Sequence, residues 1–222
     1  MRRQATIPLL VIGNKNYSSW SLRPWLLLRK SGIAFEEHRI PLYQPQSKVE
    51  ILRFSPSGKV PTLIDGEVTV WDSLAICEYV AERHSGLRLW PDTLPARAGA
   101  RAACTEMHSG FADLRAQMPM NCRRSLPGLG RTPAALADIE RVNALFNDCR
   151  ERYQSLGPFL FGRFSIADAM YAPVVLRFRT YAVNLHGAAQ DYAQAICALP
   201  ELQEWVTAAK EESEVIAKFE LA

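Results

Sequence analysis

The pattern of apolar and polar positions changes character roughly ninety residues into the chain. Up to residue 86, short apolar runs of strand length alternate with segments that have helical spacing. Beyond residue 94, the periodic segments have the three-to-four-residue spacing of amphipathic helices. The pattern therefore predicts a first half that mixes strands and helices and a second half built of helices alone.

The first three elements are expected within residues 7–42. Residues 7–13 (IPLLVIG) form a short apolar run typical of a central strand, and residues 21–32 (SLRPWLLLRKSG) have helical character up to Gly32. Residues 35–42 (FEEHRIPL) alternate and stop at a proline, which predicts a second strand. Two strands joined through a helix favour a right-handed parallel crossover.

A hairpin and a helix are expected next. The segments VPTLI and EVTVW flank Asp65-Gly66, a dipeptide that favours a type I′ turn. Residues 72–86 then read as a helix with Asp72 or Ser73 as N-cap and Gly86 at its end. The order β-α-β followed by β-β-α predicts an α/β thioredoxin-like domain over residues 1–86.

The helical half begins around a segment with two prolines, LRLWPDTLPAR, which breaks the preceding pattern. Residues 87–94 are predicted to be a linker, and residues 95–222 an all-α domain. Its main helices are expected at about residues 95–120, 132–155 and 165–183, with shorter helices after them. Ser165 and Asp168 have the spacing of a capping box at the start of the third of these.

Charge and composition exclude several classes of protein. The formal net charge is +3, with 26 basic and 23 acidic residues, too small an excess to indicate nucleic-acid binding. No stretch has the length of a membrane span or the plan of a secretory signal. The five cysteines and four histidines are scattered, which predicts reduced thiols in a cytoplasmic protein and no metal site.

Three serines surround a tryptophan where the first strand leads into the first helix, in residues 16–25 (NYSSWSLRPW). One of them is expected to cap the helix, and Ser21 best fits a purely capping role. A hydroxyl at a helix N-terminus can also donate to an anionic ligand, where the partial positive charge adds to its effect. Capping and ligand binding both remain open for Ser18 and Ser19.

Four short motifs resemble those of the cytosolic glutathione transferases, in the right order along both halves. SSWSLR resembles the serine-type signature, closest to that of the zeta class, Ser-Ser-Cys-Ser-Trp-Arg. GKVPTL is similar to the cis-proline segment, WDSLAICEYV to the motif that opens the third helix, and FSIADAMYAP to the capping box of the helical domain. The chain departs from the zeta signature at Trp20, in place of cysteine, and at Leu22, in place of tryptophan.

The resemblance implies that the protein binds glutathione as co-substrate and activates its thiol. Lowering a thiol pKa by ~2 units requires about 2.7 kcal/mol of preferential stabilisation of the thiolate. By alignment with the zeta signature Ser18 is the expected donor to the thiolate, with Ser19 close behind. Related folds carry a redox cysteine here, and its absence argues against disulfide exchange through a protein thiol.

The same resemblance assigns the residues that hold the rest of glutathione. Its peptide is expected to pair with the backbone of Val60 before a cis Pro61, in the manner of an added strand. Asp72 and Ser73, at a helix start, are expected to hold the γ-glutamyl end. Two further residues complete the predicted glutathione site: Lys59 and, through a variable loop, Gln46.

The second-substrate pocket is expected on the first helices of the helical half. Five residues there are its predicted lining: Met107, His108, Phe111, Arg115 and Met118. An apolar stripe at this spacing belongs to a protein core more often than to a pocket, so both readings stay open.

The function implied is conjugation of glutathione to small electrophiles, as in detoxification, by a cytoplasmic homodimer. One alternative is a zeta-like maleylacetoacetate isomerase, which needs a cation for its dicarboxylate substrate. Arg177 and Arg179 are candidates, but they are out of register with the zeta arginine. Another alternative is a protein that binds glutathione without catalysis. No nucleic acid, membrane or metal is implied.

Overall fold

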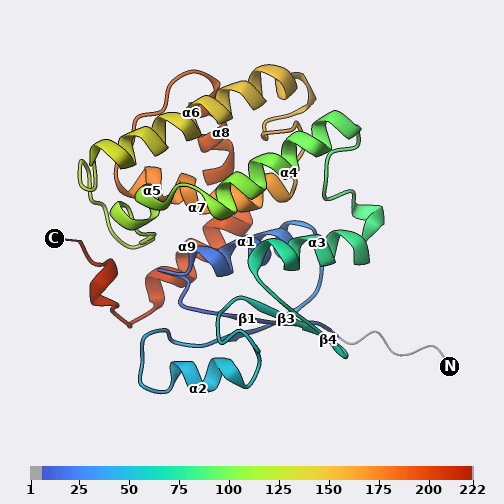
Figure 1. Cartoon of the computed structure of the whole chain (residues 1–222), viewed down its shortest axis with the longest axis vertical. Helices are drawn as coiled ribbons and strands as arrows, with labels where there is room; N and C mark the ends of the chain where they lie inside the picture. Colours follow the sequence, from blue (N-terminus) through green and yellow to red (C-terminus); the bar gives the residue numbers. More distant parts are fainter. Residues whose placement is uncertain (1–6, 222) are drawn as a thin grey trace.

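A computed structural model describes residues 7–221 and shows a small sheet packed against a larger group of helices (Figure 1). The first six residues of the expected first domain lie outside the described part. The elements of the first half are β1 (Leu9–Ile12), α1 (Ser19–Lys30), β2 (Glu36–Arg39), α2 (Ser47–Leu52), β3 (Thr62–Asp65), β4 (Val68–Trp71) and α3 (Ser73–Arg83). Those of the second half are α4 (Leu94–Ser109), α5 (Ala112–Gln117), α6 (Pro133–Tyr153), α7 (Ile166–Thr180), α8 (Ala188–Cys197) and α9 (Pro200–Glu211).

The four strands lie in the order β2-β1-β3-β4, and the predicted crossover is confirmed because β1 and β2 are parallel. The pairs β1–β3 and β3–β4 are antiparallel. Alternation along β1 sends Leu10 and Ile12 into the main core, whereas Val11 packs with Ile40 and Ile51 in a smaller core beneath α2. The sheet therefore separates α2 from α1 and α3, as Figure 1 shows. The thioredoxin-like arrangement of the first half, followed by helices alone, is as predicted.

Three local predictions were wrong. The hairpin loop is Gly66-Glu67 and not Asp65-Gly66, because Asp65 pairs with Val68. Only Gly66 has a positive φ there, +60°, so the loop is not a type I′ turn, which needs two such residues. The helix expected to end at Gly86 ends at Arg83 and is followed by a short 3-10 turn. The long helix expected over 95–120 breaks into α4 and α5 at Gly110 and Phe111.

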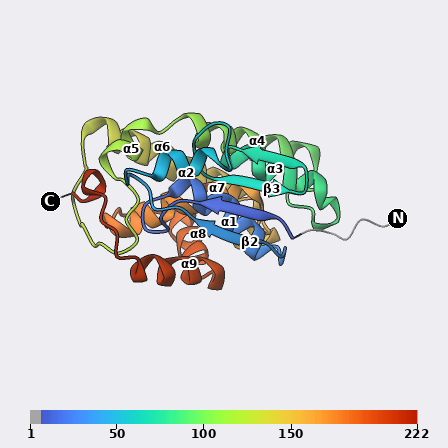
Figure 2. The same ribbon diagram turned by 90° about the horizontal axis from the view of Figure 1, so that it is seen from below.

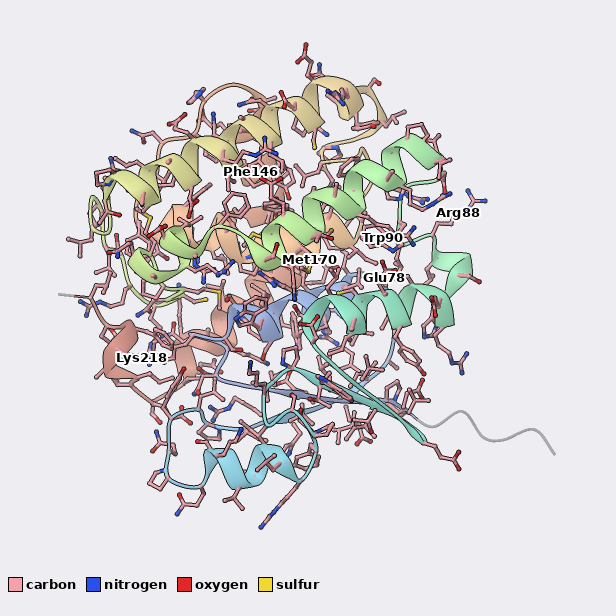
Figure 3. The ribbon with its side chains drawn as sticks, in the orientation of Figure 1. Glu78, Arg88, Trp90, Phe146, Met170 and Lys218 are labelled. Carbon is pink, nitrogen blue, oxygen red and sulfur yellow. The ribbon has the colours of Figure 1, made fainter. Side chains whose placement is uncertain are left out.

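The helical half is built around α7, in which all but one residue is buried. Phe146 and Met170 lie at the centre of this half (Figure 3). The predicted capping box is present: the Asp168 carboxylate accepts the Ser165 N–H at 2.8 Å and the Ser165 hydroxyl at 3.0 Å. Its other oxygen accepts the Leu160 N–H at 3.0 Å. Asp168 therefore ties the preceding loop to the start of α7.

The two halves meet along α1, which packs against α7 and α3 and also touches α9. The Trp25 ring of α1 lies edge-on to Trp205 of α9, with 5.0 Å between ring centroids. Between α3 and α4, the Trp90 indole donates to Glu78 at 2.8 Å, a contact visible in Figure 3. The segment after α9 turns back to the end of the molecule where α5 lies, in both Figure 1 and Figure 2. Within residues 7–221 no helix has the length and apolarity needed to cross a membrane.

Candidate active site

Two cavities adjoin where the sheet meets the helical half. The first, of about 570 Å³, is here called the serine cavity because Ser18 and Ser19 line it. The second, of about 630 Å³, contains Asp72, Ser73 and His108 and is called the Asp72 cavity. Both cavities share three lining residues: Trp20, Lys59 and Val60. A ligand with two ends can therefore occupy both cavities and cross at these residues.

The start of α1 is organised by a chain of hydrogen bonds between serines. Ser18 is the N-cap, and its Oγ accepts the Ser21 N–H at 3.3 Å. The Ser18 hydroxyl donates to Ser21 Oγ at 2.7 Å, which also accepts the Gly13 N–H at 3.1 Å. The prediction that Ser21 is the cap was therefore wrong: Ser21 is the third residue of the helix, and its hydroxyl joins the first turn to Gly13, which follows β1.

Ser19 is the first helical residue and differs from Ser18 in its partners. Its Oγ accepts a hydrogen bond from the guanidinium of Arg177 at 3.3 Å. No acceptor for the Ser19 hydroxyl proton is found in the described part of the chain. Ser19 therefore lines the cavity with a hydroxyl proton that is free to donate, while the charged guanidinium of Arg177 donates to its oxygen.

Arg177 reaches this position from α7, and within the described residues it has no acidic partner. Its other hydrogen bonds go to the carbonyls of Met118, at 2.8 Å, and Pro173, at 3.4 Å. Burial and, secondarily, the nearby Arg115 lower the pKa of Arg177 to about 10, so the guanidinium stays charged at neutral pH. A buried cation held only by neutral oxygens is costly unless an anion binds beside it.

Trp20 lies between two more arginines. The guanidinium carbon of Arg23 is 4.1 Å from the centroid of the Trp20 ring, and that of Arg115 is 5.7 Å away. Burial, then repulsion from Arg177 and Arg115, lowers the pKa of Arg23 to about 9. Arg23 donates to Ser73 Oγ at 3.3 Å and so fixes that hydroxyl at the wall of the Asp72 cavity.

Asp72 both caps α3 and faces its cavity. One carboxylate oxygen accepts the N–H groups of Leu74, at 2.9 Å, and Ala75, at 3.2 Å. The other oxygen lies 3.1 Å from Nε2 of His108, which comes from α4. The backbone of Asp72 is strained, with φ +77° and ψ 134°, as residues at functional sites often are. The capping and ligand-binding roles proposed for Asp72 are compatible, because each uses a different oxygen.

The peptide bond between Val60 and Pro61 is cis, as predicted. Val60 precedes β3 and lines both cavities. Within the described residues, neither its N–H nor its C=O pairs with another backbone group. Both groups are therefore available to an extended peptide.

The other predicted site residues are divided between cavities and core. Lys59, His108 and Arg115 line a cavity, whereas Gln46 stands at the start of α2 and lines neither. The apolar set of the expected second-substrate pocket is buried in the main core: Met107, Phe111 and Met118. Arg179 lines a separate cavity on α7 and α8, away from the serines.

Three aromatic rings that the sequence analysis did not single out form one wall of the serine cavity. Tyr17, Tyr43 and Phe219 all line it. The Phe219 ring centroid lies 5.8 Å from that of Tyr17 and 5.8 Å from that of Tyr43. The Lys218 ammonium lies 3.7 Å from the Tyr43 ring centroid. Phe219 is about 200 residues from Tyr17 along the chain, so no local pattern indicates that they meet.

The segment of residues 212–221, here called the clamp segment, fastens the loop that carries the serines. The Glu212 carboxylate accepts the N–H of Lys15 at 2.6 Å and that of Asn16 at 3.0 Å. The Tyr17 hydroxyl donates to Glu220 at 2.6 Å, and Asn121 of the helical half donates to the same oxygen. The clamp segment thus joins the serine loop to the helical half.

Replacing Glu212 by alanine is expected to free this loop. The N–H groups of Lys15 and Asn16 lose their charged acceptor, which stabilises such a contact by roughly 1.5–3 kcal/mol. Hydrogen exchange of these two amides should become at least about tenfold faster, while exchange in α6 stays unchanged. Glu211→Ala is the matched control, because Glu211 is exposed at the end of α9. Equal exchange rates in both variants would contradict the clamping role.

The fold and this site define a class of protein: a thioredoxin-like half joined to an all-helical half, with two serines that line a cavity at the start of α1. Residues 17–83 match the glutathione S-transferase N-terminal domain, and residues 97–208 match the glutathione S-transferase C-terminal domain. The chain belongs to the glutathione S-transferase family.

Individual relatives are distant. A probable maleylacetoacetate isomerase of Caenorhabditis elegans is 33% identical over 108 residues, 48% of this chain and 49% of that protein. The probable maleylacetoacetate isomerase of Vibrio cholerae is 27% identical over 197 residues, 82% of this chain and 88% of that protein. The first of these matches spans about half of the relative's length.

A solved structure agrees in fold. The glutathione transferase homologue from Burkholderia, with bound glutathione, superposes with a TM-score of 0.68 at 22% identity. The superposition covers 94% of this chain and all of that one. Within the part of the chain that the structure describes, no group of three histidine, cysteine or acidic side chains is placed to hold a metal ion.

Proposed function

We propose that the protein is a glutathione transferase that binds glutathione across the two cavities and activates its thiol for attack on a small electrophile. The observation that carries the proposal is the serine pair at the start of α1. The buried Arg177, which has no acidic partner among the described residues, donates to the Ser19 oxygen. A cation in this position favours the thiolate over the neutral thiol by direct charge attraction. The helix N-terminus adds a favourable partial charge of the same sign.

Ser19 is the donor to the thiolate in this proposal, although the zeta-like signature favours Ser18. The Ser18 proton is already directed to Ser21, and its oxygen caps the helix. The Ser19 proton is free, and Arg177 makes that hydroxyl a stronger donor by donating to its oxygen. Ser18 acts as the residue that positions the start of the helix.

The remainder of glutathione is assigned by the chemistry of each wall. The free backbone groups of Val60 pair with the peptide, as in strand addition. The γ-glutamyl carboxylate binds the Ser73 hydroxyl and the N-terminus of α3. The α-ammonium group of the same residue binds the Asp72 carboxylate oxygen that faces His108 in this structure. The glycine carboxylate binds Lys48 or Lys59, which line the serine cavity.

An ultraviolet titration of glutathione bound to the purified protein tests the proposal. Thiolate absorbance followed against pH should give a bound thiol pKa at least ~1 unit below that of free glutathione. Calorimetry on the same sample measures binding separately. Binding with an unshifted thiol pKa would indicate a carrier without catalysis, and no binding would refute the proposed function.

A second candidate is isomerisation of a maleylacetoacetate-like substrate, because two of the relatives reported above carry that name. The same thiolate would add to a double bond and leave again after rotation. The replacement of the signature cysteine by Trp20 and of the tryptophan by Leu22 weighs against it. A direct assay with maleylacetone, following loss of the cis absorbance, separates this activity from conjugation.

Detoxification in the cytoplasm by a homodimer completes the proposal. The scattered cysteines and the family support these assignments. Light scattering on the eluted protein measures the oligomeric state, and a monomer of 24.9 kDa would contradict the dimer.

A further inference from the structure

The serine cavity contains an excess of positive charge. Among the described residues, four cationic side chains and no carboxylate line it: Lys48, Lys59, Arg115 and Arg177. The inference rests on the proposed function, in which ionised glutathione brings two negative charges into this cavity: its thiolate and its glycine carboxylate. The γ-glutamyl end lies in the Asp72 cavity and does not change this count. Glutathione therefore brings fewer anionic groups into the serine cavity than the cavity has cationic side chains.

Arg115 is the cation that glutathione leaves free. Arg177 contacts Ser19, where the thiolate binds, and the two lysines flank the glycine end. Arg115 comes from α5 in the helical half, and its Nη1 donates only to the carbonyls of Met107 and Gly110. Its Nε and Nη2 have no hydrogen-bond partner in the described part of the chain.

Neither Glu106 nor Asp138 forms an ion pair with Arg115. Glu106 forms a double hydrogen bond with Arg141, at 2.6 and 2.8 Å. Asp138 acts on Arg115 only through space, while its carboxylate accepts the Leu114 N–H at 2.9 Å. A guanidinium with two free donor groups at a cavity wall is suited to a carboxylate or sulfonate, which it binds through paired hydrogen bonds.

Aromatic rings line the same cavity. Tyr17, Tyr43 and Phe219 form the wall described above, and Trp20 lies beside Arg115. Flat rings stack or pack edge-on against such a wall, which favours an aromatic substrate over an aliphatic one of equal charge.

We propose that the second substrate is an aromatic electrophile with an anionic substituent, which Arg115 binds while the aromatic wall holds the ring. The glutathione thiolate attacks the ring carbon that carries a halogen, so a carbon–sulfur bond forms. The carbon–halogen bond breaks, and halide leaves with the bonding electron pair. The thiol proton has already passed to solvent when the thiolate formed, so no oxidant or reductant is needed.

A matched pair of substrates tests the proposal: 4-chloro-3-nitrobenzoate, which is anionic, and 4-chloro-3-nitrobenzamide, which is neutral. Dividing each kcat/KM by the uncatalysed rate with glutathione removes the difference in ring reactivity. The ratio of the corrected kcat/KM for the acid to that for the amide should exceed one in the native enzyme. Arg115→Met should lower the ratio by about tenfold or more, the expected effect of losing a charged hydrogen-bond donor.

Two further variants separate anion binding from a structural role. Arg115→Lys retains the charge and should recover part of the preference for the acid. Arg131→Met is the matched control, because Arg131 also donates to a carbonyl, that of Ala182, but lines neither cavity of the site. An acid-to-amide ratio that does not change in Arg115→Met, whether or not both rates fall together, would overturn the proposal. Failure of the proposed function itself is seen separately, as an unshifted bound thiol pKa in the native protein.

Discussion

Ser19→Ala is expected to lower kcat/KM for glutathione conjugation on the order of 10²-fold and to raise the bound thiol pKa part of the way to its value in free glutathione. The physical reason is that, in the proposed function, the thiolate loses the Ser19 hydroxyl as its hydrogen-bond donor. Arg177 loses its hydrogen bond to the Ser19 oxygen but keeps its charge, and the helix N-terminus keeps its partial charge, so part of the pKa shift remains. Stopped-flow rates with a chromogenic electrophile and the ultraviolet titration measure the two effects.

Ser18→Ala is the matched comparison, since it removes the neighbouring hydroxyl. Loss of this N-cap is expected to destabilise the protein by about 1 kcal/mol, with a smaller loss of activity. If Ser18→Ala abolishes the thiol pKa shift and Ser19→Ala retains it, the zeta-like assignment holds and the hydrogen-bond argument for Ser19 is refuted. Glutathione affinity from calorimetry should stay similar in both variants.

Asp168→Ala is expected to cause the largest loss of stability, about 3–5 kcal/mol. It leaves the buried N–H groups of Leu160 and Ser165 without acceptors and removes the capping box at the start of α7. Urea unfolding followed by tryptophan fluorescence measures the change. Asp191→Ala is the control, because Asp191 lies in the first turn of α8 but is exposed. Similar losses in both variants would contradict the role given to Asp168.

The same carboxylate predicts a dependence of stability on pH. Burial raises the pKa of Asp168 to about 6, above its value in the unfolded chain. The folded state therefore holds this proton more tightly, and the contribution of the group to stability is complete below about pH 4. It falls as the pH rises through about 6. The difference in unfolding free energy between the native protein and Asp168→Asn should follow this course, and a difference that rises with pH would contradict it.

Local patterns predicted the parts of the fold that local physics determines. The parallel crossover follows from two apolar strands around a helix, and the capping box from Ser165 and Asp168 at fixed spacing. The hairpin was misplaced by one residue because Asp65 and Gly66 carry a turn signal that strand pairing overrides. The break between α4 and α5 was missed because the helical spacing continues through Phe111, which adopts a φ of +55°.

The candidate site was predicted where it is built from one segment and missed where distant segments meet. The serines, the cis proline segment and Asp72 all stand in motifs that can be read along the chain. The charge behind Ser19 comes from α7, 158 residues further on, and the aromatic wall is completed by Phe219. The apolar stripe with Met107 and Met118 has the same spacing in a pocket as in a core, and burial alone distinguishes them.

The clamp segment has a consequence for the order in which the protein becomes active during its synthesis. Lys15 and Glu212 are 197 residues apart, so the ribosome makes the serine loop long before the acid that holds it. At roughly 5–20 residues per second this interval is about 10–40 s. Throughout that time the nascent sheet can form, but the loop lacks its acceptors and its aromatic neighbour. In a nascent chain, the loop that carries Ser18 and Ser19 therefore lacks the contacts that fasten it until translation has reached the clamp segment.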